Sequence, residues 1–382
     1  MSTTMRRLIP IALAALAAQA AGAQSIFDSE LRFAPQFVQF QVHAPNNETI
    51  SELAIPVFVS IPFGPSFTFD VGTAYARAHV TNGSVTSELA GLTDTQLRGN
   101  LTLGNDFVIL TGGVNLPTGQ SSVTDDQLSA AGRIGSDFLA FPISNLGTGF
   151  AYTGGIAIAR PLGDWNLGFG GSVRASSAYS PFSDAASASI RFQPGNEYRG
   201  RVGLDHPFGA GRISLGVTYS AFGDDAAGSS VYNTGNRIIS QVVIANQIGS
   251  TDVTIAGYDV FRADGSYANN QKAGKENIIN GYLGLGLHML GTVWEPSIEG
   301  RNWFQAIPPG VGGNTTTSDR SQFSYLGTAG LRTRLEFAGI GLYPSGSYTF
   351  GRLATLTSSN ALTHADLTGF KVQIAARLSV PQ

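Results

Sequence analysis

The feature that most constrains this chain is a repeated alternation of apolar with small or polar residues, without any apolar run long enough for a membrane-spanning helix. Every odd-numbered position from Leu53 to Phe63 is apolar, and the pattern resumes after a turn at 64–66. A period of two over about ten residues predicts a β-strand with one apolar face and one polar or small face. The same pattern recurs at 165–174, 212–219 and 370–380.

The connections between these segments also alternate in length. Short turns are predicted at 64–66, 104–106, 161–164, 207–211, 248–250, 290–292 and 338–339. Long polar loops are predicted at 43–49, 81–91, 117–147, 178–196, 223–235, 264–274, 305–320 and 352–364. Short turns at one end and long loops at the other are typical of outer-membrane barrels.

We therefore predict an all-β fold, a transmembrane antiparallel up-and-down barrel with short periplasmic turns and long extracellular loops. The count is about sixteen strands. Fourteen is the alternative, because the first strand (31–42) and the pair over 236–263 have the weakest patterns. Closure is required physically, since an open sheet in lipid would leave unpaired N–H and C=O groups at its edges.

The N-terminus is typical of a secretory signal. Arg6 and Arg7 precede an apolar stretch at 8–18, and small residues at 21–23 form a cleavage site. The predicted organisation is a signal peptide at 1–23 and a barrel at 24–382, located in the bacterial outer membrane after cleavage near Ala23. The expected partners are outer-membrane lipid and lipopolysaccharide, the barrel-assembly machinery and small-molecule solutes. The sequence does not specify an oligomer.

Composition narrows the function. Only 13% of residues are charged and 48 of 382 are glycine, which suits a chain with little water-facing surface and room inside a curved wall. The absence of cysteine excludes a disulfide scaffold and thiolate chemistry. A formal charge of −3 with three lysines disfavours nucleic-acid binding. No cofactor or metal is predicted, because the aspartates at 125, 126 and 137 match no calcium-loop spacing.

Aromatic residues gather where the bilayer interfaces would lie. Trp165 and Trp294 are close to short turns, which predicts a periplasmic girdle. An outer girdle is predicted near the loop ends, formed by Tyr75, Tyr219, Phe222, Trp303 and Phe304. The alternative interpretation is that aromatic residues are simply common in strands.

With these features, residues 31–380 resemble Gram-negative outer-membrane β-barrel proteins of the channel or transporter type. The hairpin at 101–120, with Leu116-Pro117-Thr118-Gly119, is also similar to outer-membrane transporters linked to phenol degradation by the meta pathway, over residues 92–147. The resemblance implies transport of small solutes, with hydrophobic or aromatic solutes as candidates. One departure is the C-terminus: barrels of this class usually end on an aromatic residue read by the assembly machinery, and this chain ends Val380-Pro381-Gln382.

The polar face of the predicted strands carries charges of both signs. The lumen-lining candidates are Asp70, Asp94, Arg98, Arg174, Arg199, Arg201, Glu295, Glu299, Arg301, Arg332, Arg334, Glu336, Lys371 and Arg377, and Glu52, Glu197, Asp205 and Arg212 share that face. Facing charges can form an eyelet that selects solutes. They can equally brace the interior as a ladder of ion pairs, with cross-strand pairs expected between 295–301 and 332–336.

The loop at 117–147 is the longest and has internal structure. A capping-box pattern from Thr124 to Gln127 predicts a helix start, and a cluster of apolar residues follows at 138–143. The loop either folds into the barrel as a constriction or packs outside as a lid. The constriction candidates are Asp125, Asp126, Phe138 and Phe141.

Catalysis is not predicted. The chain has no G-x-S-x-G, H-E-x-x-H or P-loop motif. Among the five histidines, His79 is the candidate for a rim hydrolase, and no acidic partner is identifiable for it. The predicted function is a channel or transporter for passive diffusion of small solutes. The alternative is a structural or surface-interaction barrel with a closed lumen.

Overall fold

The computed structural model describes residues 29–380 except 44–46, 105–106, 185–189, 268–270, 311–313, 338–339 and 357–361. The predicted signal peptide, its cleavage site and the final two residues lie outside the described residues, so those predictions stay open. No helix in the described part is long and apolar enough to cross a membrane.

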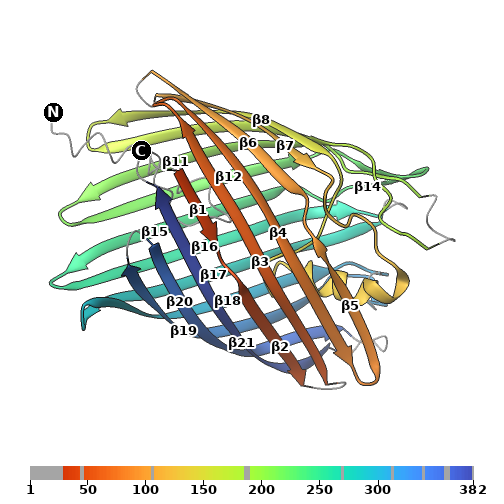
Figure 1. Cartoon of the computed structure of the whole chain (residues 1–382). Coiled ribbons are helices and arrows are strands. Elements are labelled where there is room, and N and C mark those ends of the chain that lie inside the picture. The colour runs from red at the N-terminus through yellow and green to blue at the C-terminus, as the bar shows by residue number, and fades with distance from the viewer. Residues whose placement is uncertain are drawn as a thin grey trace.

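The strands form one closed antiparallel barrel (Figure 1). β1 (Ser29–Phe33) and β2 (Gln36–His43) share the first wall position, and both pair with β3 (Glu48–Phe63). They also pair with the last strand, β21 (Leu362–Val380), which closes the ring. β5 (Val85–Leu92) and β6 (Thr95–Leu103) share another position beside β4 (Phe67–Asn82).

The other wall strands each pair with the strands before and after them. They are β7 (Val108–Leu116), β8 (Ala151–Leu162), β9 (Trp165–Ser176), β11 (Glu197–Phe208), β12 (Gly211–Phe222), β15 (Arg237–Ile248), β16 (Thr251–Ser266), β17 (Lys272–Met289), β18 (Thr292–Ile307), β19 (Arg320–Phe337) and β20 (Ile340–Leu356). The sheet has 18 strand segments. Because two positions hold two segments each, the wall has sixteen positions, which confirms the predicted count.

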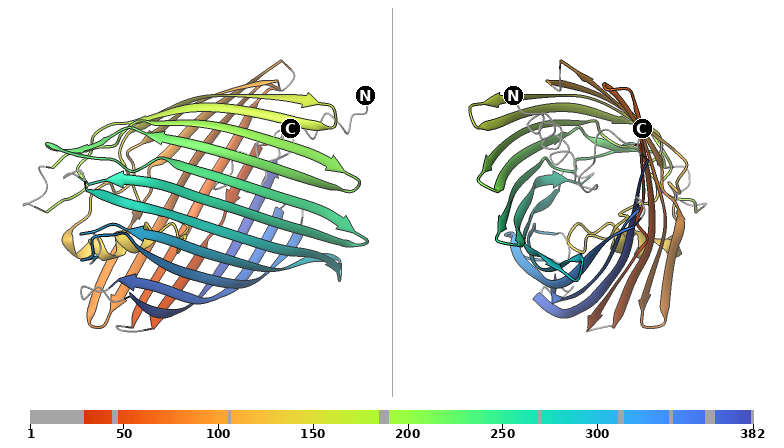
Figure 2. Two further views of the ribbon diagram at one scale, coloured as in Figure 1. Left: turned by 180° about the vertical axis from the view of Figure 1, so that it is seen from behind. Right: turned by 60° about the vertical axis from the view of Figure 1, so that its left-hand side comes forward.

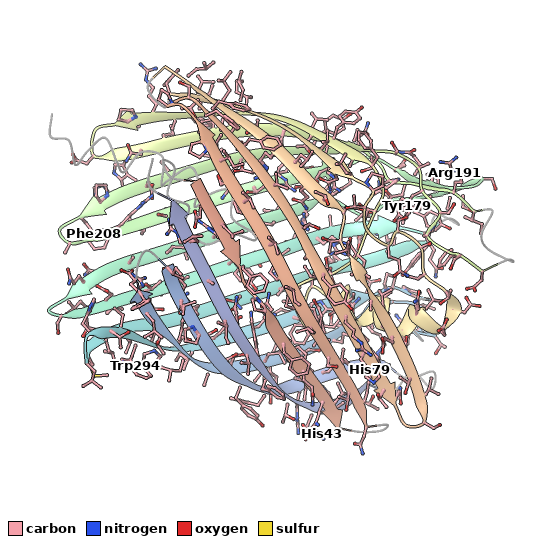
Figure 3. All side chains as sticks on the ribbon, in the orientation of Figure 1. His43, His79, Tyr179, Arg191, Phe208 and Trp294 are labelled. Atoms are coloured by element: carbon pink, nitrogen blue, oxygen red, sulfur yellow. The ribbon has the colours of Figure 1, made fainter. Side chains whose placement is uncertain are left out.

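Short turns lie together at the end of the barrel where β1 begins and β21 ends (Figure 1). The connection between β17 and β18 is two residues long, and both have positive φ, 53° at Leu290 and 74° at Gly291. This is the backbone of a type I′ hairpin turn, which matches the twist of the flanking strands. Figure 3 places Phe208 and Trp294 near this end and His43 and His79 near the other.

The opposite end carries the longer connections. Residues 117–150, here called the internal loop, contain a 3-10 helix η2 (Asp125–Gln127) and α2 (Leu128–Ile134), as the capping box predicts. The next two connections meet in a three-stranded sheet, here called the cap sheet, formed by β10 (Phe192–Gln193), β13 (Asp225–Ala227) and β14 (Ser230–Tyr232).

Three predicted loops are wrong in extent. Residues 81–91 are a hairpin with a two-residue turn at 83–84, because β4 continues to Asn82 and β5 returns along it. β16 and β17 extend to Ser266 and from Lys272, so 264–274 is mostly strand. β20 and β21 likewise extend into 352–364. In each case cross-strand pairing continues through residues whose polar composition had suggested a loop.

The wall is taller on one side than on the other. β8, β9, β11, β12 and β15 have 12 residues each, whereas β17 to β21 have 16 to 19. At about 3.3 Å per residue and a tilt of ~40°, 12 residues span about 30 Å, the thickness of a bilayer core. Since the short turns share one end, the longer strands extend beyond this height at the loop end.

The outer surface exposes large apolar side chains along every part of the wall. On the 12-residue strands these include Phe169 (51% exposed), Val202 (44%) and Val217 (49%). Such a surface is stable against lipid chains and unstable in water, which is the arrangement of a transmembrane barrel.

Candidate functional site

The inner face of the wall is identified by what touches it. Glu52 on β3 accepts a hydrogen bond from the backbone N–H of Ile143 in the internal loop, at 2.9 Å. Because side chains alternate across a strand and opposite residues share a face, the strand register extends this inner face around the ring. The predicted lumen residues placed on the inner face by register are Asp70, Arg98, Arg174, Arg199, Arg201, Glu295, Glu299, Arg301, Arg332, Arg334, Glu336, Lys371 and Arg377.

The internal loop lies inside the ring of strands (Figure 2, right). Arg133 on α2 pairs with Glu48 on β3 at 2.8 Å. Asp137 pairs with Arg262 on β16 at 2.7 Å, which is a distant part of the wall. A segment that contacts well-separated wall strands on their inner face crosses the lumen. Of the two predicted arrangements, the structure has the loop inside the barrel.

Aromatic packing fixes the far side of this loop. The Phe138 ring stacks on Trp303 of β18 with centroids 5.4 Å apart, and Phe141 packs edge-on against Phe40 of β2, also at 5.4 Å. The backbone oxygen of Phe138 accepts a hydrogen bond from Arg301 Nη1 at 2.8 Å. Phe138 is 1% exposed and Phe141 is 6% exposed, so both side chains are buried between the internal loop and the wall.

Two residues of the predicted outer girdle therefore face inward. Trp303 stacks on the internal loop, and Phe222 lies under the guanidinium of Arg237, 5.8 Å from its ring centroid. Assigning them to the girdle was wrong, because proximity to a strand end does not fix which face a side chain takes. In the pair Trp303-Phe304, one ring points in and the other out.

The base of the internal loop is anchored by Asp94, which lies between β5 and β6. Its Oδ1 accepts a hydrogen bond from Gly119 N–H at 3.1 Å, and its Oδ2 accepts one from Thr148 N–H at 2.8 Å. A side chain at Gly119 would collide with the backbone oxygen of Leu146, 2.1 Å from an ideal Cβ. One carboxylate thus ties both ends of the loop to the wall.

The other constriction candidates lie away from these anchors. Asp125 and Asp126 are exposed at the start of η2. The backbone N–H of Asp125 donates to Asp184 in the next loop at 2.7 Å. Tyr179 in that loop packs edge-on against Phe192 of the cap sheet, and its burial raises the pKa of the phenol. Asp125 therefore joins the internal loop to the loop that leads into the cap sheet.

Most inner charges are paired. Glu295 pairs with Arg332 and, at 3.7 Å, with Arg334, the cross-strand contacts expected between those segments. Glu299 pairs with Arg301 at 2.8 Å and Glu197 with Arg199 at 2.7 Å. Further pairs join Asp205 to Arg212, Arg262 to Glu276 at 3.0 Å, and Glu30 to both Arg32 and Arg377.

Three predicted lumen arginines differ from the rest. Arg98, Arg174 and Arg201 have no ion pair and no side-chain hydrogen bond within the described chain. Arg98 and Arg174 have a carboxylate opposite them in the register, Asp70 and Glu197 respectively. Arg201 has Gly170 and Thr218 opposite it, and therefore no acidic neighbour across either strand pair.

Outside the barrel, His79 has an acidic neighbour that the sequence did not reveal. Its Nδ1 is 3.7 Å from Glu88 Oε2, and its Nε2 is 3.1 Å from the Thr81 hydroxyl. The expectation of no acidic partner was wrong, because β5 follows β4 in a hairpin. Glu88 is also held by two hydrogen bonds from Arg77, at 3.0 and 2.9 Å. Among the described residues, no group of three or more His, Asp or Glu is placed to hold a metal ion.

No protein-family model and no curated protein matches this chain. Among solved structures it is similar to Pseudomonas aeruginosa OccK7 (OpdD), with 10% identity and a TM-score of 0.45, covering 92% of this chain and 100% of the other. It is also similar to OmpT of Vibrio cholerae, with 10% identity and a TM-score of 0.42, covering 94% of this chain and 99% of the other. A third similar structure is the anion-selective porin from Comamonas acidovorans, with 11% identity and a TM-score of 0.41, covering 92% of this chain and 98% of the other. Likeness at these levels carries no functional argument. The narrower resemblance to phenol-pathway transporters stays a prediction.

Proposed function

We propose that this chain is a bacterial outer-membrane channel through which small solutes diffuse passively. The observation that carries the proposal is the inner face of β9, β11 and β12, where Gly170, Arg201 and Thr218 lie opposite one another and each is partly exposed. Gly170 has no side chain, and a Cβ built there would meet nothing closer than 3.6 Å, which leaves room in this part of the lumen.

The internal loop supports the same proposal by where it packs. α2 packs on β3, β4 and β5, and its neighbouring residues bind β16 and β18. Within the described chain, none of its side-chain hydrogen bonds or ion pairs reaches β9, β11 or β12. The loop narrows the lumen from one side and makes no such contact with the inner face around Gly170.

Cysteine modification in planar bilayers tests the proposal, since the chain has no natural cysteine. Thr218→Cys lies on the inner face of β12, and Val217→Cys beside it lies on the outer face. We expect the folded protein to give steady conductance steps. A charged thiol-directed reagent added from the aqueous side should reduce them in the Thr218 variant and leave the Val217 variant unchanged.

The alternative is a closed barrel that acts through its surface. The cap sheet favours it, as does the contact of the loop before it, at Asp184, with the internal loop, because an ordered extracellular surface suits a partner-binding role. A closed barrel predicts folded but electrically silent protein, and that result would overturn the channel proposal.

A further inference from the structure

Arg201 is placed unusually for an arginine inside a barrel. It projects from β11 between Gly170 on β9 and Thr218 on β12, and the next inner residue toward the short turns is Gly203. Around it the inner face carries two partly exposed hydroxyl groups, Thr218 beside it and Ser172 opposite Arg199 on β9. The half-buried guanidinium is thus surrounded on the inner face by glycines and hydroxyl side chains.

No carboxylate neutralises this charge in the described structure. Arg199 on the same strand is paired with Glu197, and Arg212 on β12 is paired with Asp205. Arg201 Nε has no hydrogen-bond partner, and the nearest charged side chain on its own strand is the cation Arg199. A partly buried cation next to another cation is stabilised only by water or by an incoming anion.

The inner carboxylates on the loop side do not supply that anion. Glu48, Glu52 and Asp94 are 5%, 0% and 7% exposed. Each is already bound within the barrel, Glu48 to Arg133, Glu52 to the backbone of Ile143, and Asp94 to the ends of the internal loop. The acidic groups are buried under the loop, while the cation stands on the uncovered wall.

We propose that Arg201, with the hydroxyls of Thr218 and Ser172 around it, is an anion subsite that makes the channel prefer small anions, carboxylates in particular, over cations. The planar guanidinium offers parallel N–H donors that match the two oxygens of a carboxylate. The adjacent hydroxyls can donate to the same oxygens, and Gly170, which is partly exposed, leaves room for the rest of the solute. The inference rests on the proposed channel function.

The anion subsite is tested by the reversal potential of bilayer-inserted protein in a potassium chloride gradient. The same measurement is then made with potassium acetate. Wild type should pass chloride and acetate in preference to potassium. The attraction between two unit charges about 6 Å apart in water changes the local concentration of an ion about threefold. Arg201→Gln should therefore lower the anion-to-cation permeability ratio about threefold, and Arg201→Glu should lower it about tenfold. Arg201→Lys should keep chloride preference and lose part of the acetate preference.

The matched control is Arg191→Gln, which removes the same charge from an extracellular loop, where Arg191 donates to the backbone oxygen of Ala178. It should leave the ratio unchanged. Conducting wild-type protein that prefers cations, or an equal shift in the Arg191 and Arg201 variants, would overturn the subsite and leave the channel standing. Silent wild-type protein would overturn the channel itself. Retention of the heat-stable folded band on electrophoresis separates loss of selectivity from failure to fold.

Discussion

The two sides of the barrel interior differ in the residues that they carry and in whether the internal loop packs on them. On β2 to β5 the inner face is mainly apolar where the internal loop packs, and Val38, Phe40, Ile50 and Val80 are buried with Ile134 and Phe138 of that loop in one cluster. On β9 to β12 the inner face carries glycines, hydroxyls and arginines, and the loop makes no hydrogen bond or ion pair to it within the described chain. On the first side the internal loop and the wall form a buried apolar core inside the barrel. The inner face of the second side is polar and suited to contact with water and solutes.

This difference also explains the heights of the wall. The loop-bearing side includes β3 and β4, with 16 residues each, and the strands of the glycine side have 12. The additional residues of β3 and β4 supply the apolar surface on which the internal loop folds. A loop packed against a 12-residue wall would have to bury itself at the depth where solutes pass.

The largest expected effect comes from Phe138→Ala, which removes the ring stacked on Trp303. Truncating a buried phenylalanine costs about 3–5 kcal/mol, so the loop should detach from β18 for a substantial fraction of time. Single-channel recordings should show a larger and noisier conductance. Phe169→Ala is the control, because Phe169 is 51% exposed on the outer face. Identical recordings from the two variants would mean that the loop does not narrow the lumen.

Asp94→Asn should have a smaller effect at the loop base. The amide keeps one acceptor oxygen and presents an NH₂ group to the second backbone N–H, so one of two charge-assisted hydrogen bonds is lost, worth about 1.5–3 kcal/mol. We expect faster hydrogen exchange at Gly119 and Thr148, with the barrel strands unaffected. Unchanged exchange at both amides would show that Asp94 is not the anchor.

The glycine side can be tested by filling it. Gly170→Val adds a side chain on the inner face beside Arg201, and Gly171→Val adds the same group on the outer face. A Cβ meets nothing closer than 3.6 Å at Gly170 and 3.8 Å at Gly171, so both variants should fold. Conductance should fall by tens of percent only for the Gly170 variant. An equal response from both variants would contradict the assignment of inner and outer faces.

The sequence predicted the wall well because each strand carries its own pattern. Period-two alternation is local, and it is sufficient for the number of strands and for the face taken by most charges. The hairpin at 81–91 was missed although Gly83-Ser84, with Gly83 at a φ of 60°, fits a two-residue hairpin turn with glycine first, since the surrounding threonines and serines suggested a loop. Contacts such as Arg133 with Glu48 join residues far apart in sequence, and no local pattern encodes them.

The smallest effect is expected on the outside, where the wall also brings together a histidine, a hydroxyl and a carboxylate. His79→Ala should leave conductance and selectivity unchanged, because His79 lies on the opposite face from the internal loop. Its side chain is 42% exposed, so stability should change by about 0.5 kcal/mol or less. Glu88 keeps its two hydrogen bonds from Arg77, which makes the carboxylate a poor partner for a catalytic histidine and favours a structural role for the cluster. Purified wild-type protein should therefore not hydrolyse phospholipid, and hydrolysis that disappears in the His79 variant would place chemistry, rather than transport alone, on this barrel.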